Sequence, residues 1–365
     1  MLDCDHNSQS YFFVWRRDLE TGGLPAQLVE VRRGAIVESI HRGQVAVVAG
    51  NGQMIASVGT PSATTFLRSS AKPFQALPFV LSKAIDRFGF TQAELALACG
   101  SHCGEPVHIQ HAESMLSRLG LDRSALKCGK HEPFNLEAAK LLCTLGKEPD
   151  VLQNNCSGKH IAMLALALYL EAPIETYLEP SHPIQARIAK VVSKFSGVES
   201  SQLIVGTDGC GAPVFAMPVQ PMALMYARLV NPQRLSHQEM SQACDRIMTA
   251  MTNHPELVGG TVERLDTMLM RVTRGSLVSK IGAEGVYTAG VRPSASWPDG
   301  LGIAIKIEDG DNLRARPVVV IETLRQLGIL NDADLDSFRS LWDLDVLSFS
   351  REVVGKVTAC FKLGV

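Results

Sequence analysis

The order in which strand and helix patterns follow one another constrains the fold of this chain more than any other feature of its sequence. Residues 45–59 place Gly50-Asn51-Gly52 between two runs of β-branched and small apolar residues, which is typical of a β-hairpin. Helical patterns dominate the middle of the chain, and further strands are predicted at 276–281, 285–291 and 301–307. Strands joined by short loops pair antiparallel, so we expect both chain ends to complete one sheet.

The middle of the chain carries the predicted helices. Apolar residues recur at three- and four-residue intervals in segments 91–98, 107–119, 136–145, 158–170, 182–195, 222–229 and 237–252. Segment 158–170 is apolar nearly all round, which predicts a buried central helix. Two more helices, at 317–327 and 332–342, are expected to close the chain. The sequence therefore predicts an α+β fold, an antiparallel sheet built from both chain ends and flanked by helices.

Composition and charge exclude several classes of function. The 365 residues include 35 Lys+Arg and 37 Asp+Glu, for a net charge of −2. These interspersed charges give no electrostatic reason for binding nucleic acid or an anionic membrane, and no apolar run is long enough to span a bilayer. Nine cysteines without regular spacing favour a reducing compartment. We therefore expect a cytoplasmic protein, with a polar leader at residues 1–26 and a single catalytic domain at 27–365.

A Ser-x-x-Lys pair, Ser69 and Lys72, is the first candidate for catalysis. A serine is a poor nucleophile until a base takes its proton, and a lysine with a lowered pKa can be that base. On a helix the two positions share a face, although Pro73 disfavours helical geometry at Lys72 unless it lies in the first turn. About one such pair is expected by chance in a chain of this length. A helix cap at the serine and solvated charges at Arg68 and Lys72 are the competing interpretation.

Two later segments also present polar residues between small ones. CGSHCGE places Ser101 in a tight turn after a predicted helix, where a simple helix C-terminal turn is the alternative. SKIGAEG places Lys280 on a strand edge that a ligand can approach. The order Ser-x-x-Lys, isolated serine, Lys-x-Gly resembles that of penicillin-recognising serine enzymes. Two departures are that Cys103 stands where asparagine is expected, and Ile281 where a hydroxyl residue is expected.

Two cysteines lie among glycines and polar residues. They are Cys156 in NNCSGKH and Cys210 in GTDGCGAP. If Asn155 or Ser157 caps the next helix, Cys156 and Lys159 lie near its positive end, which favours a thiolate. Thiolates select zinc among abundant ions, but free cysteines are usually inert and no Cys-x-x-Cys spacing is present. The residues alone leave a metal site open.

Taken in order, RSSAKP, CGSHCGE, NNCSGKH, GTDGCGAP, HPELVGG and SKIGAEG closely resemble the motifs of the L-asparaginase II family, the rhizobial type, over about residues 28–310. The resemblance implies a serine β-lactamase-like fold and hydrolysis of L-asparagine to L-aspartate and ammonia. It also implies two Ser–Lys tandems beside a zinc ion.

The resemblance assigns roles to particular residues of this chain. The implied catalytic tandems are Ser69 with Lys72 and Ser101 with Lys280. The implied zinc ligands are Cys156, Lys159 and Cys210. The implied substrate-binding residues are Arg68, Asp208 and His160.

The resemblance leaves the specificity of the enzyme open. We expect a homodimer that acts on the small molecule L-asparagine, with no nucleic-acid or membrane partner. The open alternatives are a serine amidase of different specificity, such as a glutaminase or β-lactam hydrolase, and a non-catalytic zinc-dependent amide-binding protein.

Overall fold

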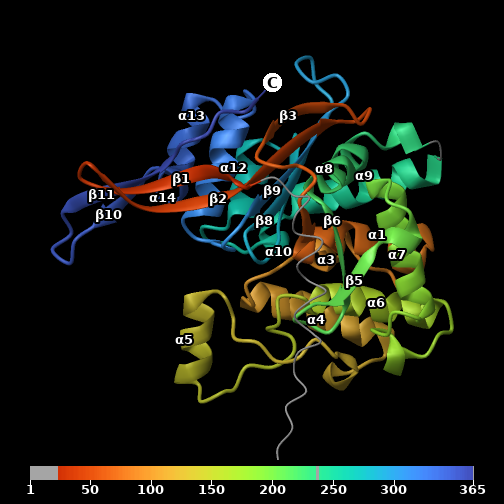
Figure 1. The fold of residues 1–365 in the computed structure, drawn as a ribbon. Helices are drawn as coiled ribbons and strands as arrows, with labels where there is room; N and C mark the ends of the chain where they lie inside the picture. The colour runs from red at the N-terminus through yellow and green to blue at the C-terminus, as the bar shows by residue number, and fades with distance from the viewer. Residues whose placement is uncertain (1–23, 236–237, 365) are drawn as a thin grey trace, which may run out of the picture.

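The main layer of the structure is an eight-stranded antiparallel sheet (Figure 1). The computed structural model describes residues 24–235 and 238–364, so most of the predicted leader and the first residue of the predicted helix 237–252 lie outside it. The strand order is β10-β11-β1-β2-β9-β8-β7, and β3 pairs with β2. The strands are β1 (Ala26–Arg33), β2 (Ile36–Ala49), β3 (Met54–Val58), β7 (Leu277–Ile281), β8 (Val286–Val291), β9 (Leu301–Ile307), β10 (Leu344–Leu347) and β11 (Val353–Ala359). The sheet built from both chain ends is thus confirmed.

Helices cover both faces of this sheet. Helix α8 (Val219–Val230) packs on one face and α12 (Ala315–Gln326) on the other. Along β2, Ala46 and Val48 join the core on the α8 side, while Val45 and Val47 join the core on the α12 side. This is why residues 45–49 form a continuous apolar run, since a strand buried on both faces needs apolar residues at every position.

Most of the remaining helices form a second lobe beside the sheet (Figure 1). Its central helix is α6 (Ser157–Tyr169), which is buried from Ser157 to Ala167 as its apolar pattern predicts. The other helices before the last strands of the main sheet are α1 (Lys72–Leu81), α2 (Ala84–Arg87), α3 (Gln92–Cys99), α4 (Pro106–Leu119), α5 (Leu136–Thr144), α7 (Pro183–Ser196), α9 (Gln238–Asn253), α10 (Pro255–Val258) and α11 (Leu265–Val272), of which α11 packs against β7. A small sheet in the order β4-β6-β5 borders this lobe. Its strands are β4 (Thr64–Phe66), β5 (Ile204–Thr207) and β6 (Pro213–Pro218).

The predicted helix at 317–327 is confirmed by α12, but the prediction that helices close the chain is wrong. Segment 332–342 is broken into two short helices, α13 (Asp332–Leu335) and α14 (Arg339–Trp342). The chain continues into strands β10 and β11, and β11 pairs with β1 in a register that places Val357 opposite Val31. This pairing joins residues more than 300 positions apart, so no local pattern announces it.

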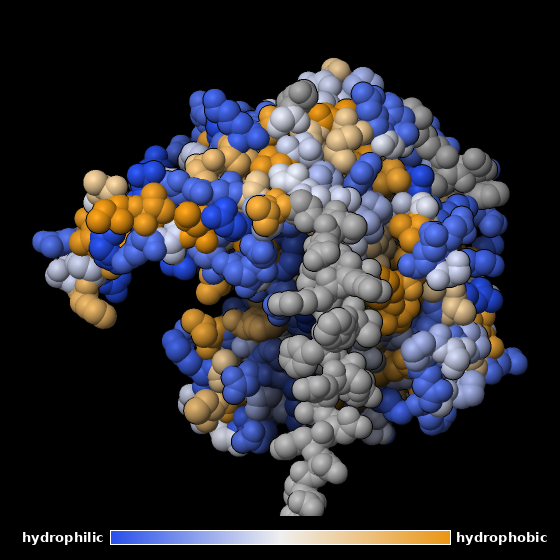
Figure 2. Space-filling model, in the orientation of Figure 1, coloured by the Kyte–Doolittle hydropathy of each residue, from blue (hydrophilic) through white to orange (hydrophobic). Residues whose placement is uncertain are grey.

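An arm formed by β1, β2, β10 and β11 extends beyond the body of the molecule (Figure 1). Figure 2 shows apolar side chains on its surface. They include Ile36, Leu347, Phe349 and Val353, of which Ile36 is 72% exposed. None of the helices in residues 24–235 and 238–364 is long and apolar enough to cross a membrane.

Candidate active site

Lys72 lies at the junction of a short 3-10 turn and a helix. The turn, Arg68–Ala71, leads directly into α1, whose first residue is Lys72. Pro73 lies in the first turn of α1, where a missing backbone N–H leaves no helical bond unmade. Pro73 is therefore compatible with a helix that begins at Lys72. The Lys72 side chain points inward and is only 1% exposed.

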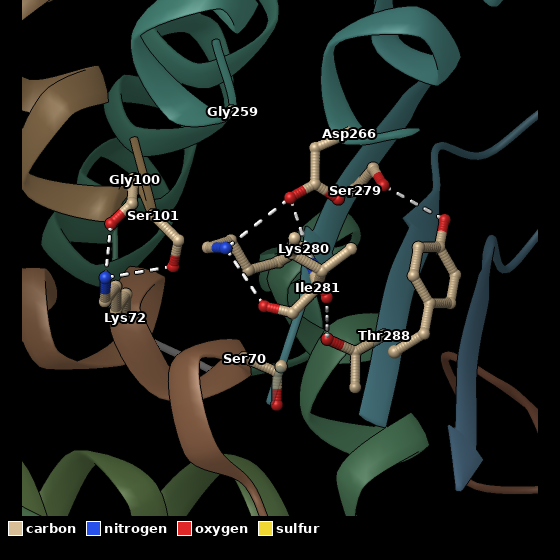
Figure 3. A network of polar contacts seen from close by, with 12 residues as sticks. Ser70, Lys72, Gly100, Ser101, Gly259, Asp266, Ser279, Lys280, Ile281 and Thr288 are labelled. Atoms are coloured by element: carbon tan, nitrogen blue, oxygen red, sulfur yellow. Dashed lines mark hydrogen bonds and ion pairs between the residues drawn. The ribbon is translucent and has the colours of Figure 1, made fainter. Parts of the chain in front are cut away.

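The Lys72 amine is surrounded by three acceptors. Its Nζ atom donates to Gly100 O at 2.6 Å and to Ser101 Oγ at 2.9 Å (Figure 3), and also to Asn155 O at 2.9 Å. Gly100 ends helix α3, as the sequence predicts, so Ser101 follows the helix at once. Burial lowers the pKa of Lys72, against an opposing contribution from Cys156. A buried lysine of lowered pKa that touches a serine hydroxyl can act as a base.

The two adjacent serines of the turn have different surroundings. Ser70 is fully buried, and its hydroxyl donates to Leu67 O at 2.6 Å. Its carbonyl accepts a hydrogen bond from Tyr226. Ser69 is half-buried, and within the described residues its hydroxyl makes no hydrogen bond, including none to Lys72. Ser70 is therefore fixed by the fold, whereas the Ser69 hydroxyl is open to another molecule.

Lys280 approaches the same region from strand β7, an edge of the main sheet. It is fully buried, and Figure 3 shows its side chain extending toward Lys72 and Ser101. Its Nζ atom contacts Asp266 Oδ2 at 3.5 Å and donates to Ile281 O at 3.0 Å. Burial lowers its pKa to about 8, although Asp266 opposes the shift. No hydrogen bond joins Lys280 to Ser101 in the part of the chain described.

The two polar cysteines and Lys159 form a second cluster. Lys159 Nζ donates to Cys210 Sγ at 3.0 Å, and the Cys156 thiol lies 3.4 Å from Asn155 Oδ1. Interaction with the Cys210 side chain, together with the charges of Lys72 and Lys159, holds the pKa of the Cys156 thiol well below its ordinary value. Burial alone would lower the pKa of Lys159, but the two cysteines outweigh it and raise it. The cluster thus pairs a thiolate with an ammonium.

The start of α6 differs in detail from the prediction. Neither Asn155 nor Ser157 is the N-cap, because Cys156 itself occupies that position. The backbone N–H of Cys156 donates instead to the side chain of Asn154. Ser157 is used elsewhere, since its hydroxyl contacts His102, the neighbour of Ser101. The segment that carries Ser101 is therefore linked directly to the start of α6, which follows Cys156.

Arg68 and Asp208 form an ion pair beside both clusters. Arg68 Nε donates to Asp208 Oδ1 at 2.8 Å, and Arg68 adopts a left-handed backbone conformation with φ of 51°. Such strain in a residue other than glycine is concentrated at functional sites. Burial raises the pKa of Asp208, but Lys159 and Arg68 outweigh it, so the group stays ionised.

His160 lies deeper than the other predicted substrate-binding residues. It is fully buried, and its Nδ1 atom lies 2.7 Å from the hydroxyl of Tyr177. Its Nε2 atom has no hydrogen-bond partner in the described residues. Burial, reinforced by Lys159 and Lys72, holds the pKa of His160 well below its usual range.

The structure adds groups that the sequence does not single out. The carbonyl of Asn155 holds Lys72, and the carboxylate of Asp266 holds Lys280. Asp266 lies in helix α11, fourteen positions before Lys280, and no motif spacing connects the two. Residues 24–235 and 238–364 contain no group of three or more His, Cys, Asp or Glu side chains arranged to hold a metal ion. The Cys156–Lys159–Cys210 cluster has two such residues and an amine.

Comparison with known proteins places the chain in a class. Its family defines an amidohydrolase. More particularly, the chain belongs to the L-asparaginase II family, whose sequence profile matches residues 29–359. No match was found among curated proteins.

The solved structures that match the chain are remote in sequence. One is a Bacillus subtilis glutaminase in covalent complex with 5-oxo-L-norleucine, with 14% identity and a TM-score of 0.38, covering 87% of this chain and 96% of that one. A Bacillus glutaminase solved in 4.3 M NaCl has 14% identity and a TM-score of 0.39, covering 84% and 93%. Mglu in its tris and glutamate form has 15% identity and a TM-score of 0.46, covering 89% of this chain and 64% of that one.

Proposed function

We propose that the chain is an L-asparaginase, which hydrolyses L-asparagine to L-aspartate and ammonia by Ser–Lys catalysis beside a zinc site. The observation that carries this proposal is the buried Lys72 amine, which contacts Ser101 and interacts with Cys156. A structural lysine gains little from burial at this depth, whereas a catalytic base requires the lowered pKa that burial gives. Membership of the L-asparaginase II family supports the substrate class.

In the proposed reaction Ser69 is the nucleophile. Its Oγ atom bonds to the carboxamide carbon of asparagine while its proton passes to neutral Lys72. The tetrahedral adduct then collapses, the C–N bond breaks, and the nitrogen takes the proton from Lys72 and leaves as ammonia. Water attacks the resulting ester and gives a proton to the lysine relay. The relay returns this proton to Ser69 Oγ as the bond between that oxygen and the acyl carbon breaks and aspartate leaves. The Lys72–Ser101 hydrogen bond supports a proton path between the two tandems.

Cys156, Lys159 and Cys210 would hold the zinc ion. Two sulfur atoms and an amine within hydrogen-bond reach of one another fit a soft divalent metal, provided that Lys159 releases its proton on binding. When bound, zinc would supply a positive charge that orients the substrate. The nucleophile in this proposal is a serine, so the metal is not needed to activate water.

Arg68, Asp208 and His160 are the proposed substrate-binding residues. A guanidinium and an ionised carboxylate side by side match the α-carboxylate and α-ammonium groups of an amino acid. The Nε2 atom of His160, which has no hydrogen-bond partner among the described residues, is a further polar group of helix α6. Substrate would exchange the Arg68–Asp208 contact for contacts of its own.

The test is release of ammonia from L-asparagine and L-glutamine, together with ring opening of a β-lactam followed by its absorbance, with and without a chelator. We expect turnover of asparagine to exceed that of the other two. Faster turnover of glutamine would replace the asparaginase assignment with a glutaminase. Binding of asparagine without turnover of any amide would favour the non-catalytic alternative.

We further propose that the enzyme is a homodimer that works in the reducing cytoplasm. Exposed apolar side chains on the arm, Phe349 among them, support an interface between copies. All eight cysteines in the described residues are free, which suits a reducing compartment. Light scattering after gel filtration tests the dimer, and a monomeric mass would overturn it.

A further inference from the structure

A buried carboxylate, that of Asp266, stands next to the second lysine of the site. It belongs to the second residue of helix α11 and is 1% exposed. Its Oδ1 atom accepts a 2.7 Å hydrogen bond from Ser279 Oγ, and its Oδ2 atom accepts a 3.0 Å bond from the backbone N–H of Ile281. Ser279 and Ile281 flank Lys280 on β7 (Figure 3). Two donors other than Lys280 therefore hold the carboxylate in place.

The contact with Lys280 itself is looser. The Nζ atom lies 3.5 Å from Asp266 Oδ2, at the long limit of a hydrogen bond, and 3.0 Å from Ile281 O. An ammonium has three N–H donors, and in the described residues the third has no acceptor. Figure 3 shows the amine on the side where Ser101 and Lys72 lie. The third N–H of Lys280 is thus free to donate a proton to a group on that side, and the neutral amine can accept one there.

The carboxylate of Asp266 offsets the positive charges that surround the Lys280 amine. The titratable and charged groups that interact electrostatically with Lys280 are Asp266 and Arg264 at α11, Lys72 of α1 and Cys99 of α3. Burial lowers the pKa of Lys280 to about 8; Asp266 raises it, while Lys72 and Arg264 lower it further. Without Asp266, this amine would face two cations in a buried site.

We propose that Asp266 is a positioning residue, whose carboxylate is held by Ser279 and Ile281 and in turn anchors the Lys280 amine toward Ser101. The catalytic half of this inference rests on the amidohydrolase function proposed above. The anchoring half does not, because it concerns the position and charge of Lys280 in the resting protein. The two halves are tested by different measurements.

The first measurement is the titration of Lys280 by NMR of protein labelled with ε-¹⁵N-lysine, with Lys280→Arg used to assign its signal. Asp266→Asn keeps the shape of the side chain but removes its charge and one of the two acceptor oxygens that Ser279 and Ile281 use. We expect the midpoint for Lys280 to fall by about one unit or more, as for loss of an opposite charge at this distance. Asp86→Asn, which breaks an exposed ion pair with Arg246, is the matched control and should leave the midpoint unchanged. An unchanged midpoint in Asp266→Asn overturns the anchoring.

The second measurement is the pH profile of asparagine hydrolysis. Asp266→Asn should lower kcat by about 10- to 100-fold with little change in KM, less than the loss from removing a general base. Its activity should also rise at lower pH than in the wild type. A profile parallel to that of the wild type overturns the positioning role. If the wild-type protein hydrolyses no amide while Asp266→Asn still shifts the Lys280 midpoint, the proposed function is overturned and the anchoring is supported.

A second variant keeps the proposal testable if Asp266→Asn fails to fold. Ser279→Ala retains the carboxylate but removes one of its two anchors. We expect a smaller shift of the Lys280 midpoint in the same direction and a smaller loss of kcat. A Ser279→Ala protein with wild-type values in both measurements counts against the network.

Discussion

Lys72 donates its side-chain hydrogen bond to Ser101, at 2.9 Å, and not to Ser69, its partner in the Ser-x-x-Lys motif. The two implied tandems are therefore not independent pairs, because one lysine contacts the serine of the other tandem. In the proposed reaction this arrangement leaves the Ser69 hydroxyl open to the substrate. It also gives Lys72 a route to return a proton through Ser101.

We expect Ser69→Ala and Lys72→Ala each to abolish most asparagine hydrolysis while the fold survives. Nucleophile and base act as one unit, so either loss should cost about 10²- to 10⁴-fold in kcat, and the double variant little more. Steady-state ammonia release from the two single variants and the double variant measures this, with circular dichroism to check folding.

Ser70→Ala is the matched control for the nucleophile. It removes a hydroxyl one position away whose bond to Leu67 O belongs to the fold, at a cost of about 1 kcal/mol of stability. Turnover should stay near that of the wild type. Near-full turnover in Ser69→Ala would instead move the nucleophile to Ser101.

Activity should rise with pH through the midpoint of Lys280. Burial lowers the pKa of this amine to about 8, so it is mostly protonated at pH 7 and mostly neutral at pH 9. Because a base must be neutral to accept a proton, kcat/KM should increase across this interval. The measurement is kcat/KM for asparagine between about pH 6 and pH 10, an interval that spans the Lys280 midpoint. A flat profile would argue against lysine bases.

Much of the fold was predictable because it follows local patterns. Segment 301–307 is a strand as predicted, and α6 is buried because its apolar residues cover every face. Helix α1 was not predicted, since Pro73 and Pro78 interrupt its helical pattern. Strand β11 was not predicted either, since its pairing with β1 joins distant parts of the chain.

The site was predictable as a set of residues but not as a set of contacts. Motif order gave Lys72, Ser101 and Lys280, yet a spacing of three does not determine which hydroxyl the Lys72 amine meets. That depends on where helix α3 ends, and so on packing between helices. Asp266 could not be predicted, since an acidic residue at the start of a helix is usually explained by the helix dipole.

Gly302→Ala should destabilise the protein severely. A Cβ atom at this position would lie 1.8 Å from the carbonyl oxygen of Ala223 and 2.5 Å from the amide nitrogen of Ala227, so α8 would have to move off β9. We expect the free energy of unfolding to fall by about 3 kcal/mol or more, as for severe overpacking. Urea denaturation measures it. Gly209→Ala is the control, since a Cβ atom there meets nothing within 4 Å, and equal stability of the two variants would contradict the packing argument.

Cys156→Ser and Cys210→Ser should lose zinc and raise KM for asparagine more than they lower kcat. The reason is that the proposed metal orients the substrate, while the attacking oxygen comes from Ser69; interactions made equally in the ground and transition states appear in KM. Zinc content by mass spectrometry, measured together with steady-state kinetics, tests both halves. Cys143→Ser, at an exposed cysteine of α5, is the control and should change neither value. Loss of all turnover on chelation, even at saturating asparagine, would show instead that the metal generates the nucleophile. Full affinity for asparagine without bound metal would overturn the orienting role, and a protein that takes up no added zinc would overturn the site.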